Sequence, residues 1–317
     1  MPSSDAPSAT LEERLLNGDR RALSRILTEV EAGSPRGLEA MRVLYPRTGR
    51  AQTIGITGSP GAGKSTVTNE LAKEYRRRGK SVGIVAIDPS SPFTEGAILG
   101  DRVRMQELTS DSEIFLRSLA SRGSLGGLSE GTMDVILAMD AFGKDVILIE
   151  TVGAGQDEVE IAGTAKTTIL VNTPGMGDDI QTMKAGIMEI ADVLAVNKAD
   201  QPGADILVSQ LSALLSLSPK VEWDPPILKV VATEGTGITE LADACDQHHA
   251  HLQDSGRIKD SERDRSRRQI LNLARRRLLS RLMEHSGGEE RLAQLVSAVA
   301  DRTLDPHSAV DQWIQEP

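Results

Sequence analysis

The sequence predicts an α/β fold with a doubly wound, mostly parallel sheet and helical segments at both ends of the chain. From about Thr53 to Thr233, short apolar runs alternate with helical stretches; the runs include TIGIT, SVGIVAID, EIFL, DVILIE, TTILVN, DVLAVN and PILKVVA. Several runs are apolar at consecutive positions, which is typical of strands covered on both faces. Ligands bind such sheets at the carboxyl ends of the strands, so the functional residues are expected there.

The two flanks of this region have helical periodicity and divide the chain into three parts: residues 1–50, 51–245 and 246–317. The first part begins with MPSSDAPSAT, which we expect to be a short disordered tail and not a signal peptide. Asn17-Gly18-Asp19 then separates two amphipathic stretches as a cap and restart. The last part contains SERDRSRRQILNLARRRLLSRLMEH, a helix whose apolar stripe must pack outside the sheet, for example on a second subunit.

The composition excludes several classes of protein. The 317 residues carry a formal net charge of −10, which argues against a general nucleic-acid binder. The arginines from Arg257 to Arg281 alternate with acids, which favours a solvated helix face with paired charges. No apolar run approaches the roughly 20 residues that span a bilayer. A single cysteine, Cys245, excludes an intrachain disulfide and fits a reducing compartment, so we expect a cytoplasmic protein.

The segment GSPGAGKS matches Gly-x-x-x-x-Gly-Lys-Ser between a predicted strand and a predicted helix. Glycines in such a loop let backbone N–H groups converge on phosphate, and the helix N-terminus adds a favourable dipole. Lys64 should contact the β and γ phosphates, and the Ser65 hydroxyl should ligate Mg²⁺. The candidate phosphate-binding residues are Gly58, Ser59, Pro60, Gly61, Ala62, Gly63, Lys64, Ser65 and Thr66.

A second motif, NKAD at Asn197–Asp200, ends another predicted strand and indicates guanine recognition. The Asp200 carboxylate can accept hydrogen bonds from guanine N1–H and N2–H₂, whereas adenine presents an acceptor at N1. Asn197 would brace the loop, and the stem of Lys198 would cover the ring. The backbone of VATEG after the next strand would reach the guanine O6; its candidate residues are Val231, Ala232 and Thr233.

Carboxylates gather at or after the ends of other predicted strands, which suggests a metal site. Mg²⁺ usually keeps several waters and takes one or two protein oxygens plus phosphates, so only some of them can be ligands. We favour Asp88 and Glu150 close to the metal, mostly through water, with Asp101 entering in one nucleotide state. Ser65 completes the predicted set.

Taken together, these residues resemble the MeaB/ArgK family, the methylmalonyl-CoA mutase-associated GTPases. The matching motifs cover most of Ile54 to Asp200; they are GITGSPGAGKST, DPSSPFTEGAILGDRVRM, RGSLGGLSEGTMD, ETVGAGQDEVEI, PGMGDDIQTMKAGIMEIAD and NKAD. The resemblance implies a P-loop GTPase that binds GTP, GDP and Mg²⁺ and forms a homodimer through a C-terminal helical arm. It also implies a chaperone that gates cofactor loading into an adenosylcobalamin-dependent acyl-CoA mutase.

The same resemblance implies three switches. DPSSPFTEGAILGD would be switch I, and ETVGAGQDE would be switch II. PGMGDDIQTMKAG would report the nucleotide state to the mutase, through Asp178, Asp179, Gln181 and Lys184. Lys184 could also swing toward the nucleotide. One departure from the family is Val231-Ala232, where Ser-Ala is common; it bears on the base contacts of that loop and leaves the aspartate argument intact.

The hydrolytic residues depart from a widespread GTPase pattern, Asp-x-x-Gly followed by glutamine. This chain has Glu150 in place of the aspartate, and its glutamine, Gln156, is displaced from Gly153. Gln156 would orient the attacking water, and no arginine finger in cis is evident. We therefore predict slow hydrolysis that rises when the mutase supplies or orders missing groups. The candidate catalytic residues are Lys64, Glu150, Gln156 and Lys184.

Two other functions share this type of sheet. A metal-insertion GTPase of the nickel metallochaperone type would need a metal site, and HHAH at His248–His251 lacks a Cys-x-x-Cys or nearby carboxylates to complete one. A P-loop kinase or transport-associated ATPase is opposed by Asp200 and by the absence of a membrane segment in the sequence.

Overall fold

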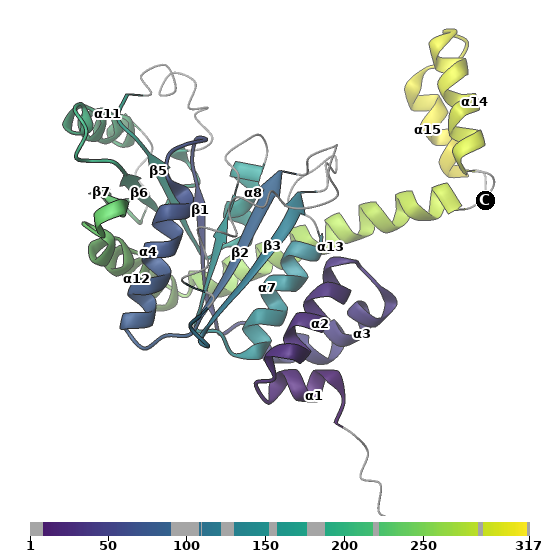
Figure 1. Ribbon diagram of the computed structural model, residues 1–317. Coiled ribbons are helices and arrows are strands. Elements are labelled where there is room, and N and C mark those ends of the chain that lie inside the picture. Colours follow the sequence, from purple (N-terminus) through teal and green to yellow (C-terminus); the bar gives the residue numbers. More distant parts are fainter. Residues whose placement is uncertain are drawn as a thin grey trace, which may run out of the picture. The chain divides into compact units, whose positions relative to one another are not determined.

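The computed structural model describes residues 9–89, 108, 110–121, 130–151, 157–175, 188–217, 222–284 and 288–315. The chain forms two compact units, Met1–Ile258 and Lys259–Pro317. The first unit holds a sheet with helices on both faces (Figure 1). The second is helical.

The sheet of the first unit has seven described strands, all paired in parallel, in the order β3-β2-β4-β1-β5-β6-β7. Their bounds are β1 Gln52–Thr57, β2 Val82–Pro89, β3 Ile114–Ser121, β4 Val146–Glu150, β5 Thr167–Asn172, β6 Val193–Val196 and β7 Ile227–Lys229. The doubly wound, parallel prediction is confirmed. The strand order reverses beside β1, which is the position where such sheets bind ligands at their carboxyl ends.

One face of the sheet is covered by α4 (Lys64–Arg77) and α12 (Ile238–Asp254). Ile54 and Ile56 of β1 point to this face, where they join a buried cluster with Val67 and Leu71 of α4. The opposite face is covered by α7 (Glu130–Phe142) and α8 (Asp157–Thr164). The helix α11 (Ala204–Leu217) packs beside β6 and β7 (Figure 1).

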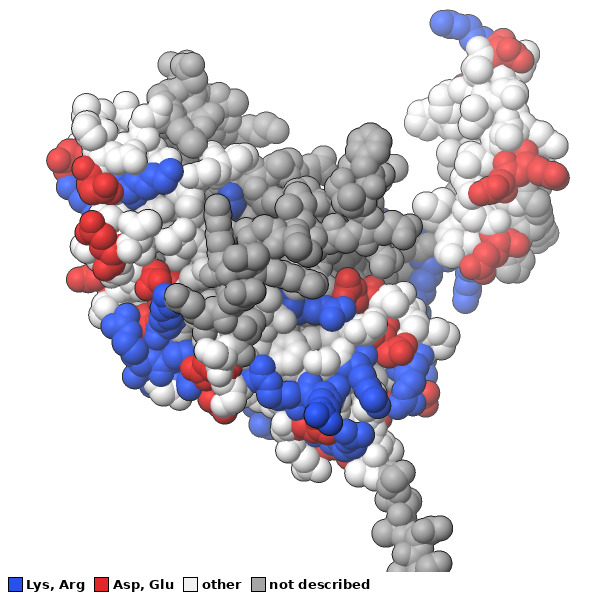
Figure 2. Space-filling model, in the orientation of Figure 1, with Lys and Arg blue, Asp and Glu red and all other residues white. Residues whose placement is uncertain are grey.

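The N-terminal helices form a further layer on α7, made of α1 (Leu11–Leu16), α2 (Arg20–Glu31), α3 (Pro35–Leu44) and the short η1 (Tyr45–Arg47). As predicted, Asp19 caps the restart: its carboxylate accepts hydrogen bonds from the N–H groups of Arg21 and Ala22. Figure 2 shows many Lys and Arg side chains over these helices and the end of α4, although the chain as a whole is acidic.

Asp140 of α7 fastens the linker between this layer and the sheet. Its buried carboxylate accepts hydrogen bonds from the backbone N–H groups of Gly49 at 2.6 Å, Arg50 at 3.2 Å and Ala51 at 3.0 Å. Three donors converge on one carboxylate, so the entry into β1 is fixed from the α7 side.

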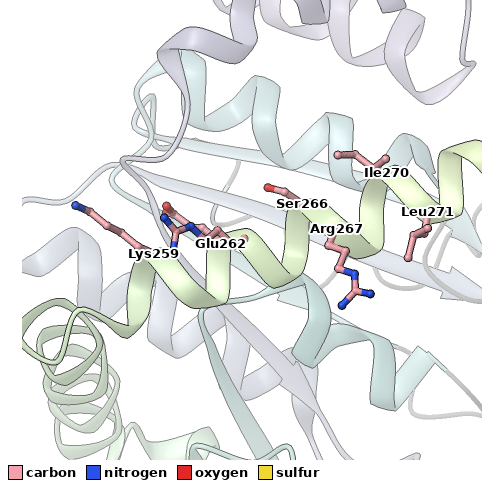
Figure 3. Close-up of a pocket in the computed structure, with 7 residues that line it drawn as sticks. Lys259, Glu262, Ser266, Arg267, Ile270 and Leu271 are labelled. Carbon is pink, nitrogen blue, oxygen red and sulfur yellow. The ribbon is translucent and has the colours of Figure 1, made fainter.

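The second unit contains most of α13 (Arg257–Glu284), followed by α14 (Gly288–Ala300) and α15 (Pro306–Gln315). The predicted long helix is confirmed. Four large apolar side chains of α13 are exposed: Ile270, Leu271, Leu278 and Leu279. Figure 3 shows the part of α13 that lines a pocket, with Lys259, Glu262, Arg263, Ser266, Arg267, Ile270 and Leu271.

Candidate nucleotide-binding site

The phosphate loop connects β1 to α4 at the carboxyl end of the central strand. Gly58, Gly61 and Gly63 have φ angles of +138°, +78° and +90°, which side chains rarely permit. A Cβ at Gly58 would lie 2.1 Å from the carbonyl oxygen of Val171, and one at Gly63 would lie 2.3 Å from Nδ2 of Asn197. Backbone conformation therefore favours glycine at all three positions, and close neighbours also require it at Gly58 and Gly63.

Lys64 opens α4 and folds back over this loop. Its side chain is nearly buried, and its ammonium donates hydrogen bonds to the carbonyl oxygens of Gly58 at 2.7 Å and Ser59 at 3.0 Å. A cation held against the loop, at the N-terminus of a helix, is suited to contact phosphate oxygens.

Ser65 and Glu150 are brought together by the pairing of β1 with β4. The register places Ile56 of β1 opposite Glu150, and the Ser65 hydroxyl donates a hydrogen bond to Oε1 of Glu150. A hydroxyl and a carboxylate are oxygen donors that Mg²⁺ prefers, so this pair fits the predicted metal. Among the residues that the structure describes, no group of three or more His, Cys, Asp or Glu could hold a metal ion.

Other predicted site residues lie beyond what the structure describes. Asp88 belongs to β2, beside β4, and only its backbone is described. Six more predicted site residues lie wholly outside the described residues: Asp101, Gln156, Asp178, Asp179, Gln181 and Lys184.

Asn197 joins the phosphate loop to the loop that follows β7. The side chain is 3% exposed; its Nδ2 donates to the carbonyl oxygen of Ala62 at 2.8 Å, and its Oδ1 accepts from the N–H of Ala232 at 3.2 Å. The three segments predicted for nucleotide binding, which are the phosphate loop, NKAD and VATEG, therefore meet at one side chain.

The other residues predicted to contact the base lie on the same two loops as Asn197 and Ala232. Lys198 has a φ of +55°, and its ammonium donates to the carbonyl oxygen of Gly61 at 3.0 Å. Asp200 is exposed, as a carboxylate that receives a base must be. Val231 begins the short loop that follows β7, where Ala232 is buried and Thr233 exposed.

Two threonines at this edge were missed by sequence reasoning. The Thr151 hydroxyl donates to Oγ1 of Thr57 at 3.2 Å, and the Thr151 N–H donates to the carbonyl oxygen of Ile56 at 3.1 Å. Thr57 directly precedes the phosphate loop, and Thr151 directly follows Glu150. The sequence signal that could have identified them is their position beside predicted site residues, in TIGIT and ETVGAG.

The histidine cluster packs at the opposite edge of the sheet, near the starts of β5 and β6. Nδ1 of His248 lies 3.0 Å from Oγ1 of Thr167, and its Nε2 lies 3.3 Å from Oδ1 of Asp192. The Trp223 ring lies 4.9 Å from that of His248 and donates its indole N–H to the carbonyl oxygen of Asp192 at 2.8 Å. Burial lowers the pKa of His248 to about 4 and raises that of Asp192 to about 7. This arrangement is a packed polar cluster, and its described residues do not provide a metal site.

Comparison with known proteins decides the family. The model of the family described as methylmalonyl Co-A mutase-associated GTPase MeaB matches residues 23–287. The chain belongs to the MeaB family.

Relatives extend over nearly the whole of this MeaB-family chain. It is 47% identical over 314 residues to a putative GTPase of Pyrococcus horikoshii, with 98% of each chain covered. It is 35% identical to the GTPase ArgK of Escherichia coli, covering 96% of each, and 32% identical to the mouse mitochondrial methylmalonic aciduria type A homolog, covering 94% of this chain and 76% of that protein. A crystal structure of a LAO/AO transport system kinase matches with a TM-score of 0.76 and 27% identity, covering 99% of this chain and 98% of the other.

The MeaB-family chain is therefore a GTPase with a P-loop fold, as predicted. Within the described part of the chain, none of the helices has the length and apolar character that a membrane span requires.

Proposed function

We propose that this GTPase is a chaperone of an adenosylcobalamin-dependent acyl-CoA mutase, and that this mutase is methylmalonyl-CoA mutase. It would gate the loading of intact cofactor and the removal of damaged cofactor. The family match over residues 23–287 carries this proposal, because the family is described by its association with that mutase. The name of the mouse relative, a methylmalonic aciduria type A homolog, supports the same client.

In the nucleotide site, the backbone of the phosphate loop and Lys64 would hold the phosphates, and Asp200 would select guanine. Mg²⁺, when bound, neutralises charge on the phosphates. Ser65 would ligate it directly, and Glu150 would hold the Ser65 hydroxyl and a metal-bound water. This role is supported by the hydrogen bond between those two side chains. Asp88 and Asp101 are proposed as further residues near the metal.

Phosphoryl transfer depends on positioning and electrostatic stabilisation, with little covalent chemistry for the protein to perform. We propose Gln156 as the residue that orients water and Lys184 as a cation that moves toward the nucleotide. Asp178, Asp179 and Gln181 would report the nucleotide state to the mutase. The enzyme alone would then be slow, and the mutase would accelerate it.

We also propose a cytoplasmic homodimer joined through the C-terminal helices. The exposed apolar residues of α13 support this part, since four large side chains on one helix favour burial against another chain. The charged face of the same helix pairs within itself, as in the 3.4 Å contact between Arg263 and Asp260.

GTP turnover measured with and without the mutase of the source organism tests the proposal. We expect the mutase to raise kcat for GTP and to bind more tightly to the chain loaded with a non-hydrolysable GTP analogue than to the GDP form. Equal turnover together with no detectable complex would contradict the chaperone function. Equal binding of GTP and ATP would contradict the role of Asp200 in selecting guanine, but it would not contradict the proposal that the mutase is the partner.

A further inference from the structure

The end of β4 is attached to the phosphate-loop region on both faces of the sheet. On the α4 face, Glu150 accepts the hydrogen bond from Ser65. On the opposite face, the hydroxyl of Thr151 donates to that of Thr57 at 3.2 Å. Side chains alternate along a strand, so the two consecutive residues of this junction point to opposite sides.

The neighbours of these residues agree with that alternation. Ile56 belongs to the buried cluster on the α4 face, which leaves Thr57 on the α7 and α8 face. Ile149 belongs to the cluster on that second face, and Thr151 lies two residues further along, so alternation directs its side chain to the same face. Thr57 is 0% exposed and Thr151 is 1% exposed. The hydroxyl pair is therefore fully enclosed in the sheet.

A buried hydroxyl needs a reason, because it must be hydrogen-bonded to offset the cost of leaving water. Valine has the same shape as threonine and would fill position 57 without a polar atom. The partner of Thr57 is the second residue of the predicted switch II and directly follows the predicted metal carboxylate, Glu150. The pair joins two polypeptide segments that must keep a fixed separation during phosphoryl transfer.

We infer that Thr57 is a positioning residue of the GTPase: through Thr151 it fixes the backbone at Glu150, and thereby the direction in which the Ser65 hydroxyl faces the nucleotide. Thr57 touches neither nucleotide nor metal in this role. Its effect passes from Thr57 to Thr151, and from there through Glu150 to Ser65. The inference rests on the magnesium site of the proposed function.

The experiment compares Thr57→Val with Thr53→Val and Thr57→Ser. Thr53 is a matched control because it lies on the same face of β1, is 6% exposed, and accepts a hydrogen bond from the N–H of Lys166 at 2.9 Å, away from the phosphate loop. The readouts are kcat for GTP, the Mg²⁺ concentration that gives half-maximal turnover, and the affinity for a fluorescent GDP with Mg²⁺ and with excess EDTA.

For Thr57→Val we expect kcat to fall about tenfold, the upper range for one lost hydrogen bond. The Mg²⁺ requirement should rise severalfold, and GDP affinity should fall with Mg²⁺ but stay within twofold of the unmodified protein in EDTA. Thr57→Ser should stay close to the unmodified protein. Thr53→Val should lower the thermal unfolding temperature without changing the Mg²⁺ requirement.

The inference is overturned if Thr57→Val and Thr53→Val change stability alike and leave kcat and the Mg²⁺ requirement unchanged. It is also overturned if Thr57→Ser loses as much as Thr57→Val, since the hydroxyl would then be irrelevant. A failure of the magnesium proposal appears differently: the unmodified protein would turn over GTP equally well in EDTA.

Discussion

Replacing Asn197 by alanine should loosen the phosphate loop from the rest of the nucleotide site. The side chain makes two buried hydrogen bonds, to the carbonyl oxygen of Ala62 and from the N–H of Ala232. Ala62 is 0% exposed and Ala232 is 2% exposed, so water cannot readily replace the amide at either group. Each buried group left without its partner costs about 1–3 kcal/mol, so the two together should lower the unfolding free energy by about 2–6 kcal/mol.

The same change should weaken nucleotide binding. Phosphate is held by N–H groups that converge from the loop, so a loop that has lost its brace presents them less well. We expect the dissociation constant for GDP to rise about tenfold to a hundredfold, or about 1.4–2.8 kcal/mol. Urea unfolding followed by circular dichroism measures the first effect, and titration with a fluorescent GDP measures the second.

Lys198→Ala is the control for the stability measurement, because Lys198 makes an exposed hydrogen bond to the carbonyl oxygen of Gly61 in the same loop. Exposed contacts of this kind change stability by about 0.5 kcal/mol or less. If Asn197→Ala loses stability but binds GDP within twofold of the unmodified protein, the brace serves only folding. If Lys198→Ala lowers the unfolding free energy as much as Asn197→Ala does, the reasoning from burial is wrong.

Two further predictions concern the carboxylates of Asp140 and Asp192. Asp140→Ala removes the acceptor of three backbone N–H groups, so the unfolding free energy measured in urea should fall by about 3 kcal/mol. The control is Glu39→Ala, at an exposed position, which should change the unfolding free energy by less than about 0.5 kcal/mol. Asp192 has its pKa raised to about 7 from 3.8, so its native form binds a proton more tightly than the unfolded form. Stability from this proton is present below pH 3.8 and is lost as the pH rises to about 7. The thermal unfolding temperature of Asp192→Asn relative to the unmodified protein should therefore increase between pH 5 and pH 8; a difference independent of pH would refute the shift.

The strands and the phosphate loop were predictable because their signals are local. Consecutive branched residues such as Ile147, Leu148 and Ile149 lie between two buried clusters, and only a strand covered on both faces needs such a run. Some positions of the loop accept only glycine, as at Gly58, where a Cβ would collide with the carbonyl oxygen of Val171. Pattern and spacing in the sequence therefore led to the correct elements.

Features that depend on register between distant segments were not predictable in this way. The run EIFL predicted a short strand, but β3 extends to Ser121 because it pairs with β2 over eight residues. Its polar Arg117 is accommodated by an ion pair with Glu31 of α2, which no local pattern indicates. The Thr57–Thr151 pair likewise exists only because β1 and β4 align Ile56 with Glu150.

The packing of Trp223 against two histidines gives the molecule a built-in optical label. The sequence contains two tryptophans, and one falls in each compact unit: Trp223 in the first and Trp313, on α15, in the second. Single Trp→Phe variants therefore leave a chain whose emission reports one unit at a time. The Trp223 ring also lies 4.9 Å from the ring of His248 and 5.3 Å from the ring of His251. Burial lowers the pKa of His248 to about 4, so the intensity of the Trp223 signal should change when His248 gains a proton in acid.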